Sequence, residues 1–152
     1  MKKLFLCLIL AGAIFSLTAY AAIDLEGLMD NFQKATDLQR QAIVKDNLNK
    51  EVSASGKVNN VGEYDFFDIV NDIKGIYYQV SLEQQKTKAN TPYQVIFLFK
   101  DRDKVKDLDK GQNFQKDGQV IRILDERLQL SVWLFCGELA ETDKALFNKA
   151  IY

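Results

Sequence analysis

Alternating apolar and polar residues constrain this chain more than any other feature of its sequence. A period of two places the apolar side chains on one face of a strand and the polar ones on the other. The pattern begins at Val52, directly after a stretch with helical periodicity, and it returns three more times. The four segments are 52–58, 76–82, 93–99 and 128–136, of which 93–99 is apolar on both faces apart from Gln94.

A fifth strand covers Val120 to Leu124, and the sequence leaves its beginning open. The strand could start as early as Gln112 with Gly118 as a bulge, or a tight turn at Asp117-Gly118 could divide it into a hairpin. In the last strand, Cys136 falls on the core side of the alternation, which predicts a buried and inert thiol.

Three helices are expected around these strands. The first runs from about Asp24 to Asn47 and is capped by Asp24, and it either packs on its own domain or binds a partner. A short helix fits 101–110, and Thr142 would cap a final helix. The apolar stripe of the first helix is Leu25, Leu28, Phe32, Ala35, Leu38 and Ala42, and the final helix would carry Leu146, Phe147, Ala150 and Ile151 on its inner side.

The order helix, three strands, short helix, two strands, helix is that of the five-stranded Greek-key OB barrel. The run 48–58 (LNKEVSASGKV), preceded by a helix, and the run 105–112 (VKDLDKGQ) resemble the exported OB-fold domains of the tRNA-anticodon-like superfamily. Those domains have a Gly-x-Val-like step in the first strand and a Leu-x-Lys-Gly element that opens the fourth. Gln112 departs from the acidic residue of many relatives, and Gly118 must serve as the mid-strand glycine.

The resemblance spans most of residues 32–139 and implies a mainly β (α+β) fold without implying tRNA binding. We therefore expect a signal peptide at 1–21, the N-terminal helix in 22–50, the barrel in 51–139 and the C-terminal helix in 140–152. The barrel is expected to be a closed one with a solid centre, because five amphipathic strands must bury their apolar faces together.

The first 21 residues have the composition of an export signal. Lys2 and Lys3 form a basic start, residues 4–17 an apolar stretch, and Ala19-Tyr20-Ala21 a small-x-small cleavage site. The alternative is a membrane anchor, but Gly12 and Ser16 interrupt an apolar run that is short of the ~20 residues that span a bilayer. We expect cleavage, no stable membrane anchor afterwards, and a location in the bacterial periplasm or outside the cell.

The residues that are missing exclude several classes of site. The chain contains no histidine, and Cys136 is the only cysteine after the signal, so His-dependent nucleophiles, His- or Cys-ligated zinc sites and an intramolecular disulfide of the mature chain are ruled out. No glycine-rich phosphate loop occurs. Without Lys2 and Lys3 the net charge falls from −1 to −3, which disfavours nucleic acid as a partner. We expect no cofactor and no metal.

OB barrels usually bind ligands on the outer face of their second and third strands, between flanking loops. On this chain, that face corresponds to Tyr77, Gln79, Ser81 and Gln94, framed by the loops 59–74, 84–91 and 125–127. The first loop adds aromatic residues among acidic ones, Tyr64 and Phe66, which could stack on a sugar or accept a basic peptide. The alternative is that Phe66 and Ile69 only plug one end of the barrel.

These observations predict a non-catalytic binding or adaptor module in the cell envelope, with a protein, peptide or glycan as its partner and an unknown oligomeric state. The alternative is a small enzyme acting on an envelope glycan with paired carboxylates, such as Glu63 with Asp65 or Asp68. A cleft holding two carboxylates at hydrolase separation would favour the enzyme, and a filled barrel would favour the adaptor.

Overall fold

The computed structural model describes residues 23–65, 76–126, 129–139 and 141. Two helices come first, α1 (Leu25–Lys34) and α2 (Asp37–Asn47). The strands follow: β1 (Glu51–Asp65), β2 (Ile76–Leu82), β3 (Gln85–Lys86), β4 (Pro92–Phe99), β5 (Asn113–Glu126) and β6 (Gln129–Phe135). A three-residue 3-10 helix, Arg102–Lys104, lies between β4 and β5. The expected signal peptide falls outside the described residues.

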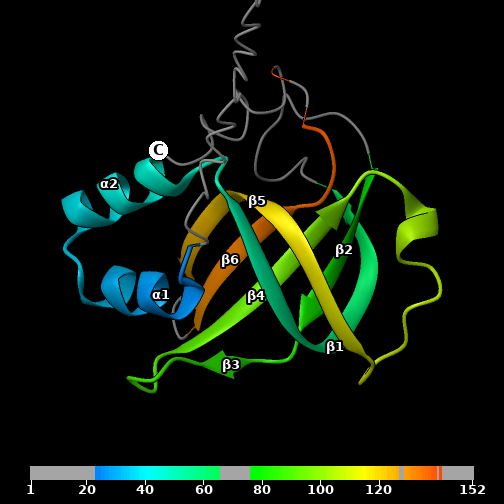
Figure 1. Ribbon diagram of the computed structural model, residues 1–152, viewed down its shortest axis with the longest axis horizontal. Helices are drawn as coiled ribbons and strands as arrows, with labels where there is room; N and C mark the ends of the chain where they lie inside the picture. Colours follow the sequence, from blue (N-terminus) through cyan, green and yellow to red (C-terminus); the bar gives the residue numbers. More distant parts are fainter. Residues whose placement is uncertain (1–22, 66–75, 127–128, 140, 142–152) are drawn as a thin grey trace, which may run out of the picture.

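The strands form a nearly closed ring (Figure 1). Around the ring, β1 pairs with β2, β2 with β4, β4 with β6, β6 with β5, and β5 again with β1. All of these pairs are antiparallel except β4–β6, which is parallel. The two-residue β3 pairs with the start of β4 outside this ring. Six strands are therefore present where the sequence predicted five.

The long strand β1 pairs with two other strands, β5 and β2, and this double pairing allows the sheet to close into a ring. Its first half, 51–57, pairs with β5, and its second half pairs with β2 from Val58 onward. A bulge between Val58 and Asn60 marks the change, as expected where a strand bends. Gly56 lies just before it, and a side chain there would contact Gln85 and Leu82. The second half of β1 was predicted to be a loop.

The interior of the ring is filled with side chains from the predicted inner faces of the strands. Val80, Phe97, Val120, Val132 and Leu134 are all fully buried there. Helix α1 adds Leu25, Leu28, Met29 and Phe32 to the same cluster, and Val105 adds to it from the segment after β4. The expectation of a solid centre is therefore met within the described part of the chain.

A second hydrophobic cluster lies on the outer face of β2, β4, β5 and β6. Its residues alternate with those of the interior, as the period of two requires. Tyr64 and Leu124 pack against it as partly buried neighbours. The buried members are Tyr77, Ile96, Leu98, Ile121, Trp133, Phe135 and Leu139. The sheet thus buries apolar residues on both faces, which explains why 93–99 is almost continuously apolar.

The single N-terminal helix of the sequence prediction is wrong, because two helices occupy that region. The chain is extended at Ala35 and Thr36, and Thr36 starts α2 with a capping box in which its backbone N–H donates to Gln39 Oε1 at 2.9 Å. The break also ends the predicted apolar stripe. Leu38 is 78% exposed, and Val44 is the one buried residue of α2. Asp24 is the N-cap of α1, but its side chain makes no capping bond.

The helix predicted over 101–110 is also wrong. Asp101 accepts a hydrogen bond from the Asp103 N–H and starts the 3-10 helix, which ends at Lys104. The segment has only two apolar residues, Val105 and Leu108, so it lacks the stripe that a longer helix needs. The predicted C-terminal helix lies outside the described residues.

The hairpin alternative for the strand predicted at 120–124 is contradicted, since β5 is continuous from Asn113 to Glu126. Gly118 lies within the strand, and the irregularity falls later, between Val120 and Arg122. Among the described residues, no helix has both the length and the apolar character to cross a membrane.

Candidate functional site

The outer face of β2 and β4 was predicted to bind a ligand, and in the structure this face continues onto the neighbouring β6 and has two halves. In the apolar half, Leu98 lies opposite Phe135 and Ile96 opposite Trp133. In the polar half, Gln94 lies opposite Ser131, and the strands begin at Pro92 and Gln129. The first half thus presents aromatic and aliphatic side chains, and the second presents amide and hydroxyl groups.

The predicted aromatic site residues belong to the apolar half. Tyr77 is 3% exposed, and its ring meets the ring of Phe135 edge-on at 6.3 Å. Tyr64 lies on β1 with its ring centroid 5.0 Å from that of Trp133. The Trp133 indole N–H donates to Ser131 Oγ at 3.1 Å. These rings are therefore packed against one another in the second cluster, and Phe66 lies outside the described residues.

Two of the predicted polar site residues make structural hydrogen bonds. The Gln94 side-chain amide donates to the Leu82 carbonyl at 3.1 Å, which extends the contact between β2 and β4 beyond their paired residues. Ser81 is buried, and its hydroxyl lies 3.5 Å from the Asn60 carbonyl. Gln79 lies half-buried on β2, opposite Leu98. The predicted set is thus spread across the face and is not gathered around one cavity.

A groove of about 310 Å³ lies at the polar end of this face. It falls between the C-terminal end of α1, the turn between β3 and β4, and the ends of β5 and β6, which lie on the same side of the molecule in Figure 1. Its volume is at the lower end of the range for ligand sites. The lining residues are Gln33, Ala89, Asn90, Thr91, Pro92, Asp125, Gln129 and Leu130.

One wall of the groove is the turn between β3 and β4, and Asp30 of α1 holds this turn in place. The Thr87 hydroxyl donates to Asp30 Oδ1, and the Thr91 N–H donates to Thr87 Oγ1 at 3.1 Å. Within the turn, the Thr87 N–H also donates to the Thr91 carbonyl at 3.0 Å. Asn90 has a φ of 65°, the left-handed region that asparagine tolerates better than most residues. Helix α1 therefore holds the turn that carries Asn90 and Thr91.

The environment of Asp30 favours its ionised form. The hydrogen bond from Thr87 is the largest cause and lowers the pKa of the Asp30 carboxyl below its ordinary value of 3.8. Partial desolvation opposes this, and Thr91, Lys34 and the Ala89 N–H lower the pKa further. At neutral pH the carboxylate thus accepts hydrogen bonds that stabilise the turn.

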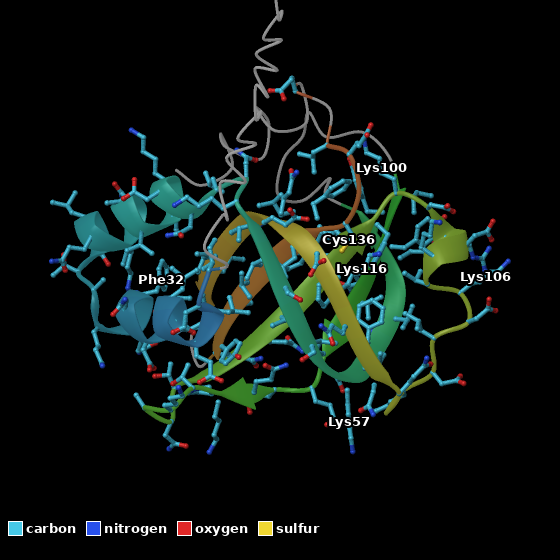
Figure 2. The ribbon with its side chains drawn as sticks, in the orientation of Figure 1. Phe32, Lys57, Lys100, Lys106, Lys116 and Cys136 are labelled. Atoms are coloured by element: carbon cyan, nitrogen blue, oxygen red, sulfur yellow. The ribbon has the colours of Figure 1, made fainter. Side chains whose placement is uncertain are left out.

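The other wall includes Gln33 and Asp125, and Arg40 of α2 holds both residues in place. Its Nη1 donates to Asp125 Oδ2 at 2.7 Å, its Nη2 to the Gln33 carbonyl at 3.2 Å, and its Nε to the Phe32 carbonyl at 3.1 Å. The guanidinium also lies over the Phe32 ring, 5.2 Å from the centroid, and Figure 2 shows Phe32 between the two helices. Arg40 therefore joins α1, α2 and the end of β5, and two of its partners line the groove.

Among the described residues, the acidic side chains form neither a group that could hold a metal ion nor a buried carboxylate. No group of three or more His, Cys, Asp or Glu among them could hold a metal ion. Their buried polar side chains are Ser81, Thr87 and Ser131, none of which is a carboxylate. Glu63 is exposed, and the side chains of Asp65 and Asp68 lie outside the description.

Burial of the Cys136 thiol raises its pKa to about 12, with a smaller opposing effect from Lys116 and a further increase from Asp117. Figure 2 labels both residues, Lys116 on β5 and Cys136 just after the end of β6. The prediction of a buried thiol is confirmed, since Cys136 is 9% exposed in the interior cluster.

The loops 84–91 and 125–127, which the sequence analysis placed beside the predicted binding face, contribute Ala89, Asn90, Thr91 and Asp125 to the groove. The sequence analysis missed the helix residues Asp30 and Gln33 on α1 and Arg40 on α2, because their polar positions look solvated from the sequence alone. The run Lys88-Ala89-Asn90-Thr91-Pro92 carried a usable signal for a turn, because asparagine tolerates the left-handed region and proline is common where a chain turns. The chain matches no protein-family profile, no curated protein and no solved structure.

Proposed function

We propose that this protein is a non-catalytic, OB-type binding module of the cell envelope that takes a protein, peptide or glycan in the groove beside Asn90 and Gln129. Two features support an OB-type barrel: a five-stranded ring, when the short β3 is set aside, and an interior filled by side chains. The export signal read in residues 1–21 supports the location.

The groove is the observation that carries the proposal. OB barrels bind beside the loop that joins their fourth and fifth strands, which here is the connection between β5 and β6. The groove lies where β5 ends and β6 begins, at Asp125 and Gln129, and Asp30 and Arg40 hold its lining segments in place through hydrogen bonds. A site with walls held in place loses little conformational entropy when a ligand binds. No observation on the described residues favours the carboxylate enzyme.

Side-chain amide signals in NMR spectra can test the site directly. The protein would be titrated with chitotetraose and with a mixture of neutral hexapeptides, while the amide signals of Gln33, Asn90 and Gln129 are followed. We expect these signals to shift with at least one probe.

Asn113 and Gln115 provide a matched control, because they line a separate groove of about 320 Å³ beside Lys57, which points away from the barrel in Figure 2. The double variant Asn90→Ala, Gln129→Ala should weaken binding, and Asn113→Ala, Gln115→Ala should not. Shifts confined to the control groove, or no shift with any probe, would overturn the proposal.

A further inference from the structure

Three of the residues that line the groove carry side-chain amides without a hydrogen-bond partner among the described residues. Gln33, Asn90 and Gln129 make no side-chain hydrogen bond within the described part of the chain. The Gln85 amide, by contrast, serves the fold, because it donates to the Ser55 carbonyl and accepts from the Tyr93 hydroxyl. The groove therefore presents donors and acceptors that remain available to a ligand.

A side-chain amide has the same hydrogen-bonding groups as a peptide group. Each primary amide offers an N–H donor and a carbonyl acceptor in one plane, so it can pair with both the C=O and the N–H of an extended backbone. Amides from three different elements, α1, the β3–β4 turn and β6, surround the groove. This arrangement can follow a backbone that runs across the groove, whatever its side chains.

The negative charge in the groove is paired with a positive charge of the same domain. Asp125 is the one charged residue among those lining it, and its Oδ2 accepts from Arg40 at 2.7 Å. A basic ligand would have to compete with Arg40 for this carboxylate, and an acidic ligand would meet its negative charge. The groove therefore favours an uncharged ligand.

Sugar binding is less well supported by the same residues. Aromatic rings offer an apolar face against which the flat face of a sugar can pack, but the lining of this groove includes none. The nearest group of rings on this face, Tyr77, Trp133 and Phe135, is buried in the second cluster. The carboxylate of Asp125, which could accept from sugar hydroxyls, is engaged by Arg40.

We infer that the groove binds an extended, uncharged peptide segment by hydrogen bonds from the side-chain amides of Gln33, Asn90 and Gln129 to the peptide backbone. This inference rests on the proposed function, because it assigns a ligand class to the same groove. The half-buried Pro92 supplies apolar surface beneath the peptide.

The test compares three probes by the same NMR titration. The first is acetyl-Ser-Asn-Thr-Ser-Asn-Thr-amide, the second is the same peptide with alternate backbone nitrogens methylated, and the third is chitotetraose. We expect the first peptide to shift the three amide signals and the methylated peptide to bind at least tenfold more weakly, because methylation removes backbone donors. Asn90→Ala with Gln129→Ala should weaken binding at least about tenfold, because the hydrogen bonds of two amides to the peptide backbone are lost.

The outcomes separate this inference from the proposed function. Equal binding of the methylated peptide would overturn backbone recognition. Binding of chitotetraose in the groove without peptide binding would overturn the inference and leave the proposed function standing. No shift with any probe would contradict both. A Lys-containing hexapeptide that binds tenfold more tightly than the neutral one would overturn the assignment of an uncharged ligand.

Discussion

Arg40 and Asp125 are 85 positions apart in the sequence, yet the Arg40 Nη1 lies 2.7 Å from Asp125 Oδ2. This contact attaches α2 to the barrel beside the groove. Since Val44 is the one buried residue of α2, the helix has little apolar burial to hold it in place. An isolated helix of 11 residues is marginal in water, so the bonds made by Arg40 are needed to dock it.

Replacing Arg40 should therefore loosen α2. We expect Arg40→Ala to lower the free energy of unfolding by about 1–2 kcal/mol, because the ion pair, two hydrogen bonds to carbonyls and the contact with Phe32 are lost together. The ion pair alone is partly exposed, so Asp125→Asn should cost less than about 1 kcal/mol. Urea unfolding measures both. Equal costs for the two variants would show that the carbonyl and ring contacts contribute nothing.

Gly118 lies where β5 packs closely on β6. A Cβ atom there would lie 3.0 Å from the Leu134 Cβ and 3.2 Å from the Phe135 carbonyl oxygen. We expect Gly118→Ala to cost about 1–3 kcal/mol in urea unfolding, as overpacking of a filled core does. Gly62→Ala is the matched control within a strand, because its Cβ would have nothing nearer than Asn60 Nδ2 at 3.7 Å. A stable Gly118→Ala variant would show that the two strands can separate without cost.

Asp30 should make the domain sensitive to acid. Its pKa is lowered in the folded state, so its stabilising effect is fully present above the ordinary value of 3.8 and is lost as the pH falls through the folded pKa. We expect Asp30→Asn to be less stable than the natural protein at pH 7 and to lose less stability between about pH 4.5 and 2.5. Urea unfolding across this range measures the difference. Asp117→Asn controls for the change in net charge, and equal acid sensitivity of Asp30→Asn and the natural protein would contradict the prediction.

The Cys136 thiol should be unreactive in the folded protein. With a pKa of about 12, its thiolate fraction at pH 8 is about a thousandfold lower than that of an ordinary thiol, and burial further limits access. In a Cys7→Ser variant, a disulfide reagent such as DTNB should react slowly before unfolding and rapidly in urea. Rapid reaction of the folded protein would show that the barrel opens near Cys136.

The sequence predicted the inner and outer faces of the strands well, because alternation is a local property of the chain. Tyr78, Val80 and Leu82 face the interior, as expected, and Tyr77 and Ser81 lie on the other face. It predicted the site less well. Tyr77 was expected to be available to a ligand, but Phe135 of β6, which is separated from β2 by β4, lies against its ring. Whether a residue on the outer face is covered depends on segments distant in the sequence, and no local pattern reports their position.

The sequence by itself determined that the chain forms strands with buried inner faces and that it contains no histidine for catalysis or metal binding. Only the tertiary structure decided which polar residues serve the fold and which remain available. Gln94 and Gln129 are the same residue type on adjacent strands, yet one amide is bonded to the Leu82 carbonyl and the other faces the groove. The physical reason is that a hydrogen bond needs a partner at the correct distance, and strand pairing brings such partners together from distant parts of the chain.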